Sequence, residues 1–180
     1  HGRPLVLDAA GREVADAHVS LSRCGAFAVA AFSVRPVGVD VQGLRDADVS
    51  LASVVLHPAE RARDDAALTR VWVLKEALLK ALGTGLATDP REIQLGGVRT
   101  PHVVSGPGRG ARLTLRELPA AGPDRPYLVA VAVLPRGGRP GRVARAAPAY
   151  PRARSATRRH RRRPGTTGLR WSRTAVAPRP

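Results

Sequence analysis

The sequence predicts an α+β fold in which a long helix packs on an antiparallel sheet. Strand-length apolar or β-branched runs follow one another before residue 43, and a strongly amphipathic helical pattern covers 66–82. Further alternating or apolar runs come after that helix. We therefore expect sequential strands on both sides of one dominant helix.

The first three predicted strands are apolar or β-branched runs at residues 18–22, 26–34 and 37–42. Cys24-Gly25 separates the first from the second, and the turn signal Arg35-Pro36 precedes the third. We interpret these runs as three sequential antiparallel strands.

Two weaker helix signals precede the main one. Residues 46–56 form a moderate helix candidate, and His57-Pro58-Ala59-Glu60 resembles a helix start with proline in the first turn. A simpler interpretation is that Glu60 closes a capping box and that His57 caps the same turn.

The main helix is predicted at 66–82 by leucines and a valine that recur every three or four residues, namely Leu68, Val71, Leu74, Leu78 and Leu82. Gly83 and Gly85 then end it. Later strands are predicted at 92–95, 111–118 and 127–134. The intervening stretch 106–110 is glycine-rich but lacks the Lys-Ser/Thr and the helix of a phosphate loop, so we expect a hairpin loop.

Charge divides the chain into two parts. Residues 1–135 hold 16 Lys/Arg and all 14 Asp/Glu, whereas residues 136–180 hold 14 arginines and no acid. Periodicity also vanishes in the second part, where Pro, Gly, Ala and Arg dominate. We expect one folded domain at 1–135 and a disordered tail at 136–180.

Composition excludes several classes of protein. The single cysteine, Cys24, rules out an intramolecular disulfide and fits a reducing compartment. The five histidines are scattered without zinc-ligand spacing, and no apolar run approaches the roughly 20 residues that span a bilayer. We expect a cytoplasmic protein without a membrane partner.

The candidate site combines one helix face and one strand. Trp72, Glu76 and Lys80 fall at i, i+4 and i+8 on a helix, and an exposed Glu–Lys pair is the alternative interpretation. In the strand 37–42, valines alternate with polar residues, so Asp40 and Gln42 share a face. A carboxylate between valines needs a cation, a metal or hydrogen-bond donors, unless Asp40 only caps a turn.

Together these residues resemble a known family. The G-V-D strand, the H-P-A-E segment and W-x-x-K-E-A-x-x-K followed by Gly-x-Gly resemble the 4′-phosphopantetheinyl transferases, specifically the larger, surfactin-synthetase-activating type built from two similar halves. The two main motifs lie about 35 residues apart in the right order. Residues 1–135 look like the second half of such an enzyme, so we expect the chain to be a fragment whose first half lies upstream.

The resemblance implies a reaction and a partner. The serine hydroxyl of an acyl or peptidyl carrier protein would attack the β-phosphate of coenzyme A, take the phosphopantetheine arm and release 3′,5′-ADP. It implies Mg²⁺ as cofactor, held by Asp40 and Glu76, with Gln42 where many relatives carry a third acid. Glu76 would also accept the serine proton, and Lys80 would neutralise phosphate oxygens. The expected setting is secondary metabolite biosynthesis.

Further coenzyme A contacts are expected at Lys75, Arg23 and Arg3. Arg23 replaces the family's histidine in an S-[LI]-S-H-S strand, and Arg3 lies in a segment like the family's G-[KR]-P. A solvated terminal arginine is the alternative for Arg3. Without the first half, one wall of the coenzyme A cleft would be missing, unless the segment self-associates as shorter members of the superfamily do.

Two alternative functions stay open. A catalytically impaired relative would bind carrier proteins without modifying them, and the arginine-rich tail could bind polyanions through phosphate contacts. A shifted reading frame in G+C-rich DNA would also produce an acid-free tail of this composition, so we do not expect nucleic acid to be the partner.

Overall fold

The computed structural model describes residues 4–25, 27–97, 99–119 and 126–136. Its strands in chain order are β1 (His18–Cys24), β2 (Phe27–Ser33), β3 (Val37–Gly43), β4 (Gln94–Gly96), β5 (His102–Ser105), β6 (Arg112–Leu118) and β7 (Tyr127–Val133). Its helices are α1 (Val49–Val55), α2 (Asp65–Leu82) and the short 3₁₀ helices η1 (Gly85–Ala87) and η2 (Pro90–Glu92). The predicted α+β class, with antiparallel sheet and a long helix, is confirmed.

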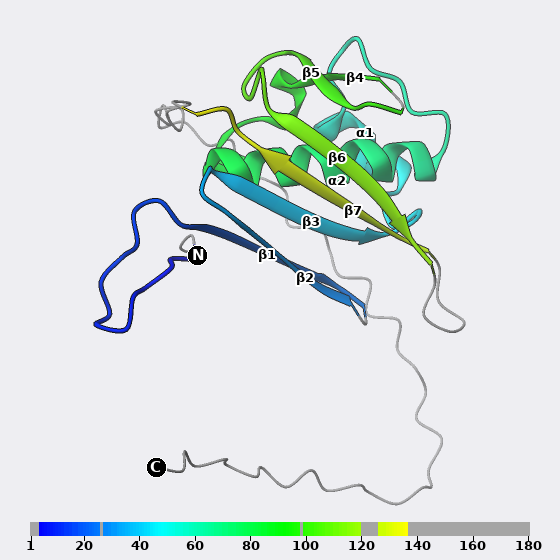
Figure 1. Ribbon diagram of the computed structural model, residues 1–180. Coiled ribbons are helices and arrows are strands. Elements are labelled where there is room, and N and C mark those ends of the chain that lie inside the picture. Colours follow the sequence, from blue (N-terminus) through cyan, green and yellow to red (C-terminus); the bar gives the residue numbers. More distant parts are fainter. Residues whose placement is uncertain (1–3, 26, 98, 120–125, 137–180) are drawn as a thin grey trace, which may run out of the picture. The chain divides into compact units, whose positions relative to one another are not determined.

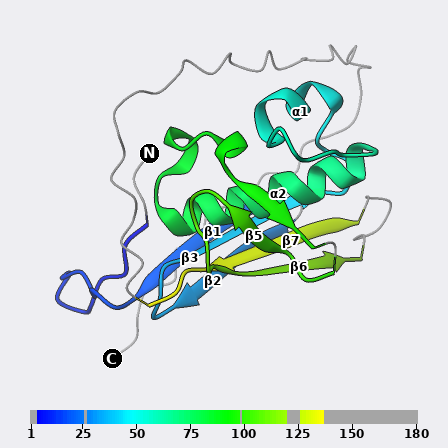
Figure 2. The ribbon, with the colours of Figure 1, turned by 90° about the horizontal axis from the view of Figure 1, so that it is seen from above.

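The main sheet has the strand order β3-β7-β6, and both pairs of strands are antiparallel. Helix α2 lies along one face of this sheet (Figures 1 and 2). The core between them is built from apolar side chains of α2, β6 and β7, including Leu78, Leu79, Leu128, Ala130 and Ala132. Burial of this continuous apolar surface is the main stabilising contribution to such a layer.

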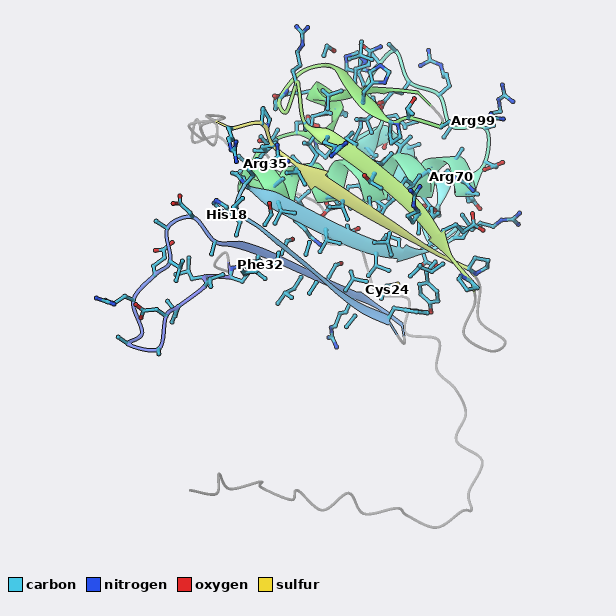
Figure 3. The ribbon with its side chains drawn as sticks, in the orientation of Figure 1. His18, Cys24, Phe32, Arg35, Arg70 and Arg99 are labelled. Atoms are coloured by element: carbon cyan, nitrogen blue, oxygen red, sulfur yellow. The ribbon has the colours of Figure 1, made fainter. Side chains whose placement is uncertain are left out.

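The hairpin β1–β2 is a separate two-stranded sheet that lies beside β3 (Figure 1). All three strands predicted in this region are present; β1 and β2 pair with each other, whereas β3 forms its backbone ladder with β7. β1 approaches β3 through side chains: Ser20 and Ser22 accept hydrogen bonds from backbone N–H groups of β3. The outer face of the hairpin carries Phe32, which is 68% exposed (Figure 3).

The helices begin and end at recognisable capping residues. Asp48 caps α1, Asp64 caps α2, and Gly83 ends α2 in the left-handed conformation (φ 71°). The segment His57–Glu60 is a turn, so the predicted helix start there is wrong. The hydrogen bonds expected of the capping interpretation are present in this turn: Glu60 Oε2 accepts the His57 N–H at 2.8 Å, and His57 Nδ1 accepts the Ala59 N–H at 3.0 Å.

The later elements depart from the prediction at one strand and one loop. β5 has no counterpart among the predicted strands; it pairs with β4, which is only three residues long. The glycine-rich stretch 106–110 is a turn, as expected, but it joins β5 to β6 of a different sheet and so is not a hairpin loop. No helix in the part of the chain that the structure describes is long and apolar enough to cross a membrane. Nearly all of the predicted tail, 137–180, lies outside the described residues.

Candidate functional site

The site begins at β3, which is buried along almost its whole length. Its even-numbered residues face α2, and Gly38 lets the helix come close: a Cβ there would overlap the Ala77 carbonyl oxygen and lie 2.9 Å from Lys80 Cβ. Two residues further along the strand, on the same face, is Asp40, with only 3% of its surface exposed. The close contact of strand and helix therefore brings this carboxylate to the Lys80 turn of α2.

Three side chains donate hydrogen bonds to Asp40. Lys80 Nζ lies 2.7 Å from Oδ1 and Ser22 Oγ lies 2.7 Å from the same oxygen, while Gln42 Nε2 lies 3.0 Å from Oδ2. Lys80 Nζ also donates to the carbonyl of Val39 at 3.0 Å. A buried carboxylate with an ammonium and two neutral donors is well compensated, since ionised acceptors form the stronger hydrogen bonds.

Glu76 lies one turn before Lys80, and the charges of Asp40 and Lys80 are both close enough to change its pKa. Burial raises the pKa of Glu76 to about 7; the Asp40 charge adds to the rise and Lys80 opposes it. Among the described residues, no hydrogen bond or ion pair to the Glu76 carboxylate is formed. The two acids thus differ: Asp40 is held by donors, and Glu76 has a proton affinity suited to exchange near neutral pH.

Some of the residues predicted to form the site lie together in the structure, and others do not. Asp40, Gln42, Glu76 and Lys80 come together at the contact of β3 and α2. Trp72 is half-buried and packs on the small core of Ala47, Val55 and Leu68, which agrees with a packing role. Lys75, next to this face in sequence, lies elsewhere.

Lys75 is fully enclosed, with 0% of its side chain exposed. Its ammonium donates to Glu60 Oε2 at 2.7 Å, to the Val55 carbonyl at 2.8 Å and to the Pro90 carbonyl at 3.0 Å. Burial lowers the pKa of Lys75, and the hydrogen bond and charge of Glu60 oppose that change. All three N–H donors are used, so the geometry does not support the prediction that Lys75 contacts coenzyme A.

Of the two arginines predicted to bind coenzyme A, the structure describes Arg23. Arg23 follows Ser22 on β1 and is exposed, on the face of the strand opposite to Ser22. Its contact with coenzyme A stays a prediction. Arg3 lies outside the described residues.

Two participants escape sequence reasoning. Ser22 bonds Asp40, and the alternation of Ser20 and Ser22 along β1 is the pattern that places both hydroxyls on one face. Glu60 is the ion-pair partner of Lys75, and its spacing in sequence gives no sign of that, because the two are brought together only by the fold.

Cys24, at the end of β1 (Figure 3), lies 3.5 Å from Asp46 Oδ2. Burial is the main reason why the pKa of Cys24 is raised, and Asp46 adds to that rise, so this thiol is not activated.

Comparison with known proteins places the chain in a family. A family model described as the 4′-phosphopantetheinyl transferase superfamily matches residues 36–130, more than half of the chain, including Asp40, Glu76 and Lys80. The chain is 29% identical over 97 residues to the 4′-phosphopantetheinyl transferase psf-1 of Bacillus pumilus, covering 48% of this chain and 39% of that protein. It is 28% identical over 79 residues to the 4′-phosphopantetheinyl transferase gsp of Aneurinibacillus migulanus, covering 39% of this chain and 33% of that protein.

The matched part thus spans about two fifths or less of the length of these relatives. The family-model match, residues 36–130, includes the contact of β3 and α2 on which the polar site is built. The chain belongs to the 4′-phosphopantetheinyl transferase superfamily.

Proposed function

We propose that the chain supplies the metal-binding and phosphate-binding residues of a Mg²⁺-dependent 4′-phosphopantetheinyl transferase. Its substrate would be coenzyme A, its partner an acyl or peptidyl carrier protein, and its by-product 3′,5′-ADP. The observation that carries the proposal is the meeting of Asp40, Glu76 and Lys80 at the contact of β3 with α2. Two carboxylates beside one ammonium suit a pyrophosphate with a divalent cation.

The residues present fit a magnesium ion. Asp40 and Glu76 offer hard carboxylate oxygens, and the Asp40 charge contributes to the raised pKa of Glu76, a repulsion that a divalent cation would relieve. Within the described ranges no cluster of three His, Cys, Asp or Glu side chains is found, but Mg²⁺ in such sites takes one or two carboxylates and completes its shell with waters and phosphates. Asp40 and Glu76 would hold the ion, and the amide oxygen of Gln42 would be the third ligand.

When bound, the ion would polarise the phosphoryl group and offset negative charge on the 5′-phosphate of the leaving 3′,5′-ADP. Glu76 would accept the proton of the carrier serine as the serine oxygen bonds to the β-phosphorus. The bond from the β-phosphorus to the bridging oxygen would break, and 3′,5′-ADP would leave with that oxygen. Lys80, 29% exposed at its side chain, would turn its ammonium toward the phosphate oxygens.

Arg23 remains a proposed coenzyme A contact: it is exposed on β1, on the strand face opposite to Ser22, and a guanidinium can bind phosphate through paired hydrogen bonds. The arginine-rich residues 136–180 are not needed for this chemistry. We place the protein in the cytoplasm, since its single thiol fits a reducing compartment.

The proposal is tested by mass spectrometry of an apo carrier protein after incubation with the full chain, coenzyme A and Mg²⁺. We expect the carrier to gain the mass of one phosphopantetheine arm at chain concentrations at which two copies associate and complete the coenzyme A cleft. Asp40→Ala and Glu76→Gln should lower the rate by about 100-fold or more, in line with loss of a metal ligand or a general base. Exposed Glu13 is the matched control, and Glu13→Gln should react at the wild-type rate.

No mass gain with several acyl and peptidyl carriers would overturn transfer by this chain. If the chain nevertheless binds those carriers, the result would favour the alternative of an impaired relative that binds carrier proteins without modifying them. Salt-sensitive binding of DNA that disappears when residues 136–180 are deleted would favour the polyanion-binding alternative.

A further inference from the structure

Ser20 and Ser22 each accept a backbone hydrogen bond along one edge of β3. The other edge of the strand pairs with β7, so the N–H groups of Val39 and Val41 on the β1 side need acceptors. Ser20 Oγ accepts from Val39 at 3.0 Å, and Ser22 Oγ accepts from Val41 at 3.3 Å. As backbone caps, the two serines are near equivalents.

Ser22 has a second contact that Ser20 lacks. A serine hydroxyl has one proton to donate, and that of Ser22 goes to Asp40 Oδ1 at 2.7 Å. Its oxygen is at the same time fixed by the Val41 N–H. The hydroxyl therefore joins the β3 backbone to the carboxylate that the same strand carries.

The other two donors to Asp40 are less constrained. Lys80 reaches the carboxylate at the end of a four-carbon side chain that is 29% exposed, and Gln42 reaches it through a flexible amide arm. The position of Ser22 Oγ depends on rotation about one bond, Cα–Cβ, and its backbone is fixed in a paired strand. Ser22 therefore loses the least conformational entropy in holding its hydroxyl in place. Of the three, the hydroxyl is the contact best able to set the direction of the carboxylate.

We infer that Ser22 is a positioning residue that fixes the orientation of Asp40 for metal binding. The inference rests on the proposed function, in which Asp40 is a metal ligand. Hydrogen-bond partners of ligating carboxylates orient the ligand, and their loss costs about 10- to 100-fold in metal affinity. The chain itself offers the control, because Ser20→Ala removes the same kind of backbone cap without touching Asp40.

The test measures Mn²⁺ binding to the full chain, without coenzyme A, by calorimetry. Ser22→Ala should weaken Mn²⁺ binding by about 10- to 100-fold, while Ser20→Ala should stay within about threefold of wild type and lose a similar amount of thermal stability. Ser22→Thr keeps a hydroxyl and should restore the affinity. Should Ser22→Ala fail to fold, Ser22→Cys serves instead, because its weaker S–H donor should give an intermediate loss.

A second readout does not need the metal. Scalar couplings of Asp40 in the metal-free protein should indicate one side-chain rotamer in wild type and Ser20→Ala, and rotamer averaging in Ser22→Ala. Wild-type Mn²⁺ affinity in Ser22→Ala, or an equal loss in Ser20→Ala, would overturn the inference. Absence of Mn²⁺ binding in wild type, with the coupling pattern as expected, would refute the metal assignment in the proposed function and keep Ser22 as the residue that orients Asp40.

Discussion

Asp40 and Glu76 are chemically alike, and their surroundings make them different. Asp40 is enclosed and accepts three side-chain hydrogen bonds. Glu76 is half-buried, with no such partner among the described residues, and the charge of Asp40 adds to the effect of partial burial on its pKa. Pairs of acids whose environments separate their proton affinities often divide the roles of charge stabiliser and base.

The raised pKa of Glu76 makes stability depend on pH. Between its ordinary value of 4.5 and the folded value of about 7, the folded state binds more protons than the unfolded state, so the free energy of unfolding falls as pH rises through this window. In EDTA, Glu76→Gln should be more stable than wild type above pH 7, by on the order of 2 kcal/mol, and the gain should disappear below the ordinary value. Denaturant unfolding at a series of pH values measures this, and a gain that is constant with pH would contradict it.

The two lysines of the chain should differ in reactivity. Lys75 is 0% exposed at its side chain and Lys80 is 29% exposed. Acetic anhydride should therefore acetylate Lys80 in the folded protein while Lys75 is protected, and peptide mapping by mass spectrometry would assign each product. In denaturant both should react at similar rates, and equal rates in the folded protein would contradict the burial of Lys75.

At the scale of elements, the contact of β3 with α2 depends on Gly38. A methyl group there would overlap the Ala77 carbonyl and approach the Ala81 nitrogen at 2.5 Å, and both are backbone atoms that a side-chain rotation cannot move. Since Lys80 Cβ lies on the same side, a shift of the helix would also draw Lys80 away from Asp40.

Gly38→Ala should lower the free energy of unfolding by about 3 kcal/mol through overpacking. Gly11 is the matched control: it has a positive φ of 77°, and a Cβ added there would meet nothing within 4 Å, so Gly11→Ala should cost only the backbone strain of about 1 kcal/mol. Chemical denaturation of both variants gives the comparison. Equal losses would show that close packing at Gly38 contributes nothing beyond the ordinary cost of replacing a glycine.

The sequence predicts those features of the fold that depend on local residue patterns. The apolar stripe of α2 and the alternation around Asp40 predict both elements and the faces that meet, because helix and strand periods are local properties. The pairing of β3 with β7 is beyond its reach, since strand partners are chosen by packing between distant segments. The surroundings of Lys75 escape it for the same reason: its neighbours along the helix belong to the site, and its three acceptors come from other parts of the chain.

At the scale of the whole domain, Glu60 and Lys75 join the elements around α2. Lys75 bonds the last residue of α1 and the first of η2, and Glu60 Oε1 accepts the Leu95 N–H of β4 at 2.7 Å. Glu60 also closes its own turn through the His57 N–H. One buried ion pair thus connects two α-helices, a turn, a 3₁₀ helix and a strand.

Removing both members of this pair should destabilise the chain by less than the sum of the two single removals. Lys75→Met keeps the length of the side chain but leaves a buried carboxylate without its cation, which costs about 3–5 kcal/mol. Glu60→Gln leaves the ammonium with two carbonyl partners, and the double variant removes both charges, so its loss should be smaller than the sum of the single losses. Denaturant unfolding of the four proteins completes the double-mutant cycle, and additive losses would contradict an ion pair that acts as a unit. Because Lys75 lies away from Asp40, folded Lys75→Met should bind Mn²⁺ with wild-type affinity, whereas a lysine of the phosphate site would change it.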